Sequence, residues 1–279
     1  MWGVTRQAYY QYYWNQEDLV LEHGLILDKV IEIRKHHRRM GGRKLYELLE
    51  PFMFDHQIKM GRDALFDLLS SHNLLVKKRK RRIKTTNSSH YYRKYPNLVK
   101  DFKPTGRNQL WVTDITYWKI REKHVYISLV TDAYSRKIVG YKLLETLEAD
   151  GPIQALKKAI SGLLSGPDGC FELIHHSDRG IQYCCKEYVK TLDKRHVKIS
   201  MTESGDPREN ALAERVNGIL KDEYLYNYSP ENIKQARQIL DQTISLYNSE
   251  RPHMSIGNLV PEKVHELNLN TDQLWKSYY

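Results

Sequence analysis

The chain has 279 residues, a hydrophobic share of 41% and a net charge of +10, which suits one large soluble domain or two smaller ones. It contains no apolar run of about 18 residues, so a membrane protein is not expected, and its N-terminus lacks the apolar core of an export signal. Its three cysteines form no CxxC pair, which argues against a disulfide framework or a zinc site and fits a reducing cytosol. We therefore expect a cytoplasmic protein.

The positive charge is concentrated in one segment. Residues 1–76 carry ten basic and ten acidic side chains, and residues 101–279 carry 24 of each. Residues 77–100, in contrast, carry ten basic side chains and no acidic one. A solvated charged surface is one interpretation of such a run. The tyrosines and small polar residues between the charges favour a segment that holds a nucleic-acid backbone.

Helices are predicted before this segment. Residues 17–38 have apolar side chains at helical spacing, and two shorter helices are predicted at 42–52, after Gly41, and at 61–74. Short helices separated by glycine-containing turns are typical of a helix-turn-helix unit that binds DNA. A plain three-helix bundle without a role in DNA binding is the alternative.

Strands are predicted after the basic segment. Three closely spaced runs of β-branched and aromatic residues, at 109–120, 124–135 and 137–145, predict an antiparallel meander. Strands and helices then alternate, with a helix at 153–164, a strand at 171–178, a helix at 181–196, a strand at 197–203 and helices at 209–226 and 232–249. This order predicts an α/β fold in which helices cover both faces of a mixed five-stranded sheet.

Two aspartates lie on strands that this fold can bring together. Asp114 is in the middle of the first strand, and Asp178 ends the short apolar strand FELIHHSD. In a meander the first and third strands are parallel, so the first strand can lie beside the fourth at the centre of the sheet. Two neighbouring carboxylates repel each other, and a cation relieves the repulsion. For Asp178 taken alone, capping of the helix that begins near Ile181 remains an alternative.

A third acid follows on the helix predicted at 209–226. Glu214 is separated from Asp178 by 35 residues, and it shares a polar stripe of this helix with Asn210, Asn217 and Lys221. Three carboxylates form a hard, oxygen-only ligand set that suits Mg²⁺ or Mn²⁺. Two such ions about 4 Å apart can hold the attacking and leaving oxygens of a phosphoryl transfer.

The three acids and the sequence motifs around them resemble those of a known family. Asp114, Asp178 and Glu214, with Lys221 seven residues further on, resemble the DDE core of retroviral integrases and bacterial transposases. The stretches WVTDITYW, HHSDRGIQY, SMTESGDPRENALAERVNGILKDEY and YNSERPHMSIGNLVP are more specifically similar to the second-frame (OrfB) proteins of the IS-three group of insertion sequences. The similarity spans the chain from about Gly3 to Pro261.

The resemblance implies a ribonuclease-H-like integrase core and a transposase that cleaves DNA strands and transfers them. It implies that Asp114, Asp178 and Glu214 are catalytic and bind two Mg²⁺ or Mn²⁺ ions, and that Lys221 contacts DNA. The implied partners are double-stranded DNA, in the form of the element's terminal inverted repeats and the target, and either further copies of the chain on DNA or a first-frame (OrfA) protein. In a bacterium, the DNA-bound protein would be associated with the nucleoid.

We accordingly expect a helical module at 1–76, a basic linker at 77–104, the catalytic core at 105–266 and a C-terminal tail at 267–279. The further candidates for DNA contact are basic side chains: Lys77, Lys78, Arg79, Lys80, Arg81, Arg82, Arg208 and Arg215. Asn210 and Asn217 are candidates for supporting the site. His176 either orients DNA or the metal site or is a hydrogen-bonded buried imidazole, and Arg251 either packs against the core or contacts DNA.

Two other functions remain open at this point. A plain ribonuclease-H-like nuclease would cut DNA without joining it. A catalytically silent DNA-binding regulator would do neither, although the intact Asp, Asp and Glu argue against it.

Overall fold

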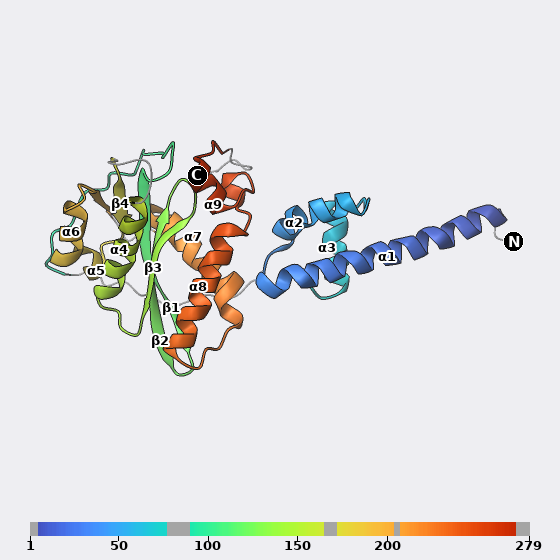
Figure 1. Ribbon diagram of the computed structural model, residues 1–279, viewed down its shortest axis with the longest axis horizontal. Coiled ribbons are helices and arrows are strands. Elements are labelled where there is room, and N and C mark those ends of the chain that lie inside the picture. The colour runs from blue at the N-terminus through green and yellow to red at the C-terminus, as the bar shows by residue number, and fades with distance from the viewer. Residues whose placement is uncertain (1–4, 77–89, 165–171, 204–206, 272–279) are drawn as a thin grey trace. The chain divides into compact units, whose positions relative to one another are not determined.

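The computed structural model describes residues 5–76, 90–164, 172–203 and 207–271. The chain divides between Lys80 and Arg81 into two compact units, an all-helical one and an α/β one (Figure 1). Within the described ranges, no helix combines the length and the apolar character needed to cross a membrane. The six basic candidates at 77–82 lie outside the described residues.

The N-terminal unit consists of three helices, α1 (Arg6–His36), α2 (Gly42–Asp55) and α3 (Arg62–Ser71). Its core is made of apolar side chains from all three: Ile26, Val30, Leu45, Leu49, Leu65 and Leu69. All three helices were predicted, but α1 begins at Arg6 rather than at residue 17. The prediction misses the first turns because they lack apolar spacing, yet they contain no glycine or proline that would end a helix.

The second unit is built on a five-stranded sheet with the order β3-β2-β1-β4-β5. Its strands are β1 (Leu110–Ile120), β2 (Lys123–Asp132), β3 (Ile138–Leu144), β4 (Ile174–Ser177) and β5 (Lys198–Met201). The first three form an antiparallel meander, and β4 and β5 are parallel to β1. The predicted mixed sheet, with the first strand beside the fourth, is therefore confirmed.

Helices cover both faces of this sheet (Figure 1). One face packs on α4 (Asp150–Leu164), α5 (Ile181–Cys184) and α6 (Lys186–Asp193). The other packs on α7 (Ala211–Ile219) and α8 (Ile233–Ser249), and α9 (Pro261–Leu267) packs on α8. The alternation of β1 explains both layers, because Trp111 and Ile115 point to the first face and Trp118 and Ile120 to the second.

The helix predicted at 181–196 is interrupted. Cys185 has an extended backbone, with ψ of 148°, and separates α5 from α6. The sequence offers no glycine or proline at this point, but Gln182, Tyr183 and Cys184 are all buried. Three consecutive buried residues do not fit one stripe of a continuous surface helix, so burial in the core accounts for the break.

The helix predicted at 209–226 is also irregular. It begins with a 3₁₀ turn (Pro207–Asn210), continues as α7, widens into a π turn (Leu220–Tyr224) and ends in a second 3₁₀ turn (Leu225–Asn227). A π turn holds an extra residue, and here it allows Leu220, Tyr224 and Leu225 to enter the core together.

Arg251 helps to fix this π turn. Its guanidinium is 1% exposed and donates two hydrogen bonds of 2.8 Å to the carboxylate of Glu223. It follows α8 and precedes a 3₁₀ turn (Met254–Ile256). Its buried ion pair supports the packing interpretation of this residue, because a guanidinium enclosed in this way is not offered to DNA.

Residues 90–103 belong to the second unit and pack along its sheet. The N–H of Leu98 donates to Oγ of Ser200 over 2.9 Å, and the N–H of Met201 donates to the carbonyl of Pro96 over 3.3 Å. These bonds run along β5, so the second half of the segment assigned to the linker is attached to the edge of the sheet.

Candidate active site

The site is located where the sheet changes from antiparallel to parallel pairing. β1 pairs with β2 over its whole length but with β4 only from Leu110 to Val112, which faces His176. Continuing this parallel register by two residues sets Asp178, just beyond the end of β4, beside Asp114 of β1. Ligands of open α/β sheets bind at such a point, outside the carboxyl ends of the strands.

Asp114 is held by two hydrogen bonds. Nδ2 of Asn217 donates to its Oδ2 over 2.8 Å, and the N–H of Ile115 donates to its Oδ1 over 2.8 Å. Burial, the charge of Asp178 and a smaller contribution from Glu214 together raise the pKa of Asp114 to about 7, against the lowering effect of the two hydrogen bonds. The structure therefore brings all three acids within electrostatic reach of one another.

Asp178 forms the turn that follows β4. Its Oδ1 accepts a hydrogen bond of 2.9 Å from the N–H of Gly180. Gly180, and not Asp178, is the N-cap residue of α5. The capping alternative for Asp178 is therefore wrong in its simple form, since the carboxylate bends the chain before the helix begins.

A histidine that is distant in sequence supports this turn. The Nε2 of His90 lies 2.7 Å from the carbonyl oxygen of Arg179, to which it donates. The sequence analysis missed His90. The available signal was its position within the basic segment, which gives no indication that the residue contacts a turn 89 positions later.

Glu214 is exposed on α7, and the helix is attached to β1 on both sides of it. Nδ2 of Asn210 donates to the carbonyl of Thr113 over 3.0 Å, and Asn217 bonds Asp114 as described. Both asparagines are buried, so this part of the predicted polar stripe is the polar contact of α7 with the strand. These bonds bring Glu214 to the part of β1 that carries Asp114.

His176 is buried and hydrogen-bonded at both ring nitrogens. Its Nε2 donates to the carbonyl of Glu209 over 3.0 Å, and its Nδ1 is 2.8 Å from Oγ of Ser200. Burial lowers the pKa of His176, which matches a neutral ring that accepts from the serine. Of the two alternatives, this geometry is that of the hydrogen-bonded buried imidazole, and it fixes the residue that precedes Asn210.

The basic candidates of this unit differ in their surroundings. Nζ of Lys221 lies 3.6 Å from the centroid of the Tyr117 ring. This is a cation–π contact with a residue of β1, the strand that also carries Asp114. Arg208 and Arg215 are exposed, on the 3₁₀ turn before α7 and on α7 itself.

The three acids are suitable ligands for a hard divalent cation, but they do not form a closed metal site. In the described part of the chain, no three histidine, cysteine, aspartate or glutamate side chains form a ready group of metal ligands. The three carboxylates nevertheless supply oxygen ligands only, and their mutual repulsion is the charge imbalance that a cation would relieve. Ligation by all three acids requires them to come closer together than they stand here.

The raised pKa predicts a pH dependence of stability in the absence of divalent ions. Asp114 titrates at about 7 in the folded chain against an ordinary value of 3.8. The folded state therefore holds an extra proton between these values, and the free energy of unfolding falls as the pH rises across this window. Asp114→Asn removes the titration, so the variant should gain on the order of 4 kcal/mol relative to the parent between about pH 4 and pH 8.

Urea unfolding in EDTA at these two pH values measures the gain. Glu187→Gln, which changes an exposed carboxylate on α6, is the control and should shift the two measurements equally. A difference between Asp114→Asn and the parent that is independent of pH would show that Asp114 titrates normally.

Comparisons with known proteins agree with this geometry. Two integrase core domain families match the chain, over residues 104–207 and 195–261. The chain is 33% identical over 273 residues to the insertion element IS600 uncharacterized 31 kDa protein of Shigella sonnei, covering 96% of this chain and 98% of the relative. It is 26% identical over 243 residues to the transposase for insertion sequence element IS629 of Shigella sonnei, covering 86% of this chain and 79% of the relative.

A solved structure shows the same fold. A chain of the cryoEM structure of the simian T-cell lymphotropic virus intasome in complex with PP2A regulatory subunit B56 gamma aligns with a TM-score of 0.50 and 16% identity, covering 88% of this chain and 76% of that one. With the sheet order, the integrase core matches and the full-length relative, the resemblance stated from the sequence is confirmed. This chain belongs to the family of bacterial insertion-sequence transposases with an integrase catalytic core.

Proposed function

We propose that the chain catalyses metal-dependent cleavage of DNA strands and their transfer to a target, the chemistry that moves an insertion sequence. The observation that supports the proposal is the approach of three acids beside the middle of β1. The parallel register of β1 and β4 sets Asp114 beside Asp178, and the amide bonds from α7 bring Glu214 to them.

Asp114, Asp178 and Glu214 are the residues that would hold Mg²⁺ or Mn²⁺, and we assign two ions to the site. When bound, the ions supply a water of lowered pKa and charge stabilisation for the phosphoryl group in transfer. The remaining tasks belong to the chain's own groups. Asn217 orients the Asp114 carboxylate, and His176 fixes the carbonyl of Glu209, at the start of the segment that carries Glu214.

DNA is the proposed partner, as the element's terminal inverted repeats and as the target. We assign contact with the DNA end to Lys221, supported by its place two turns after Glu214, and contact with neighbouring phosphates to Arg208 and Arg215, supported by their exposure. The basic residues at 77–82 are assigned to the DNA backbone from the sequence alone. Their six charges would contribute roughly −5 to the slope of log affinity against log salt.

The acids give the first test. Asp114→Asn, Asp178→Asn and Glu214→Gln should each lower cleavage and joining of labelled terminal-repeat DNA in Mg²⁺ by at least about 100-fold, because each removes an anionic oxygen ligand. DNA binding should change little. Glu187→Gln, an acid on the opposite face of the sheet, is the matched control and should retain activity.

The same assay separates the proposal from its two rivals. Cut products without joined products would identify a plain nuclease. Neither product from the parent chain, at full DNA binding, would identify a silent regulator. Substantial cleavage by any one of the three variants, at equal folding, would remove that acid from the site.

Lys221 gives the second test. Lys221→Ala should lower joining by roughly 10-fold, the loss of one charge-assisted contact, while metal-dependent stabilisation of the protein is kept. The matched control is Lys158→Ala, because Nζ of Lys158 lies 3.3 Å from the centroid of the Tyr141 ring in the same type of stack but on α4. Equal losses in both variants would mean that the lysine–tyrosine stack matters only for folding.

Assembly gives the third test. Joining two element ends requires two active sites held together, and we propose that copies of the chain assemble on DNA or through a first-frame partner. Light scattering of the DNA-free protein should therefore report a monomer. A stable dimer at low micromolar concentration would contradict this part of the proposal and show that the chain carries its own interface.

A further inference from the structure

Residues 1–76 have no net charge, but their charges are unevenly placed. Of the ten basic side chains in residues 1–76, six lie in residues 34–44, and none of the ten acids does. The six are Arg34, Lys35, Arg38, Arg39, Arg43 and Lys44. Residues 34–44 therefore carry +6 and the rest of residues 1–76 carries −6. We call these eleven residues the basic turn.

The fold gathers the basic turn into one place. It comprises the last turn of α1, the connection between the helices and the first turn of α2. Two of its residues hold it to the core, since His37 is 5% exposed and Met40 1% exposed, and the N–H of Met40 donates to the carbonyl of His37 over 3.0 Å. The side chains of Lys35, Arg38 and Arg43 are exposed.

The start of α2 adds backbone donors to this cationic surface. Its N-cap residue, Gly41, has φ of −73°, makes no side-chain cap, and has room for a Cβ without any contact within 4 Å. Neither packing nor conformation requires glycine here, in contrast to Gly42, whose Cβ would lie 2.8 Å from the Phe66 ring. A glycine cap leaves the first N–H groups of α2 open to an anion.

The start of α3 provides an internal comparison. It also begins with a glycine N-cap followed by an arginine, but Arg62 is bound by the carboxylate of Asp63 at 2.8 Å. Asp67 lies one turn further along α3. In a helix-turn-helix the later helix enters the major groove, and here that helix presents two carboxylates and one neutralised arginine.

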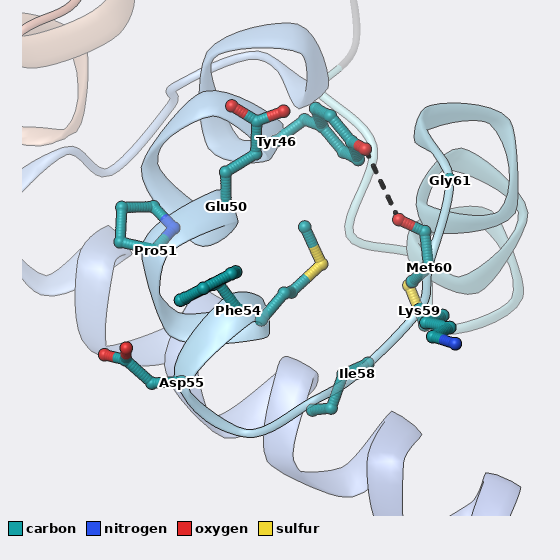
Figure 2. Close-up of a pocket in the computed structure, with 10 residues that line it drawn as sticks. Tyr46, Glu50, Pro51, Phe54, Asp55, Ile58, Lys59, Met60 and Gly61 are labelled. Atoms are coloured by element: carbon teal, nitrogen blue, oxygen red, sulfur yellow. Dashed lines mark hydrogen bonds between the residues drawn. The ribbon is translucent and has the colours of Figure 1, made fainter.

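The far end of α2 is also unsuited to DNA. There a cavity of about 700 Å³ is lined by Glu50, Asp55 and apolar side chains such as Phe54 (Figure 2). The cavity extends along α2 from Tyr46 to Asp55, so its two acids lie about 9 Å and about 16 Å along the helix from Lys44. Glu32 and Glu47 are the acids nearest to the basic turn along the chain.

We propose that the basic turn, and not α3, is the DNA-binding surface of the N-terminal unit, and that it holds duplex DNA by its phosphates. This deepens the proposed function, on which it rests for the identity of the ligand as DNA. Contacts of this kind position the duplex and read little of its sequence. The helix-turn-helix expectation is then replaced by a backbone clamp at the α1–α2 connection.

The test compares two triple variants of the full chain that remove the same charge. Lys35→Gln/Arg38→Gln/Arg43→Gln changes the basic turn, and Arg6→Gln/Lys59→Gln/Arg62→Gln changes exposed cations elsewhere in the unit. Binding isotherms on a duplex of arbitrary sequence, in EDTA at several salt concentrations, give the slope for each. The basic-turn variant should flatten the slope by roughly 2 to 3, because each phosphate contact contributes about 0.9.

The control variant should leave the slope unchanged, and the thermal midpoints of both variants should match that of the parent. A variant with all six residues at 77–82 changed to Gln gives the contribution of the linker for comparison. Equal flattening by both triples would reduce the effect to bulk charge, and no flattening by the basic-turn triple would remove DNA from this surface. Either result overturns the inference. The assay contains no metal, so it is independent of any failure of the proposed catalysis.

Discussion

Two carboxylates placed side by side at the end of paired strands cannot both be charged at low cost. The register of β1 and β4 imposes this arrangement on Asp114 and Asp178, and burial of Asp114 makes it more costly still. Among the described residues, no lysine or arginine is bonded to Asp114 to relieve the repulsion. The surrounding structure supplies an amide from Asn217 and a backbone N–H, which orient the carboxylate and leave the charge to be balanced by a bound cation.

The rest of the α/β core holds Glu214 near Asp114 and Asp178. Glu214 is on a helix whose first residues are fixed by neutral bonds, from Asn210 to β1 and from His176 to the Glu209 carbonyl. The end of the same helix is fixed by the buried pair of Glu223 with Arg251. Glu214 itself is exposed between these anchors, so the helix is attached firmly while its carboxylate faces the solvent side of the site.

The sequence predicts this core well where local patterns decide the structure. The alternation of β1 to β3, the short apolar strand before Asp178 and the spacing to Glu214 lead directly to the mixed sheet and its three acids. Prediction from the sequence fails where tertiary packing decides the local structure. The break at Cys185 has no glycine or proline at that point, and Gly218 alone does not predict the π turn that begins at Leu220. Likewise, the burial of Asn210 and Asn217 and the contact of His90 with Arg179 depend on segments distant in sequence.

The net charge of residues 1–76 shows the same limit of prediction from the sequence. Summed over residues 1–76, the charge is zero, which by itself directs attention to the linker as the sole cationic surface. The order of the residues places six positive charges within residues 34–44, a stretch that contains no acid, while the ten acids are distributed over the rest of the three helices. A phosphate backbone responds to the local field within about 10 Å at ordinary salt, and not to a sum over the unit. A segment of zero net charge can therefore hold DNA through a local cluster of cations that contains no acid.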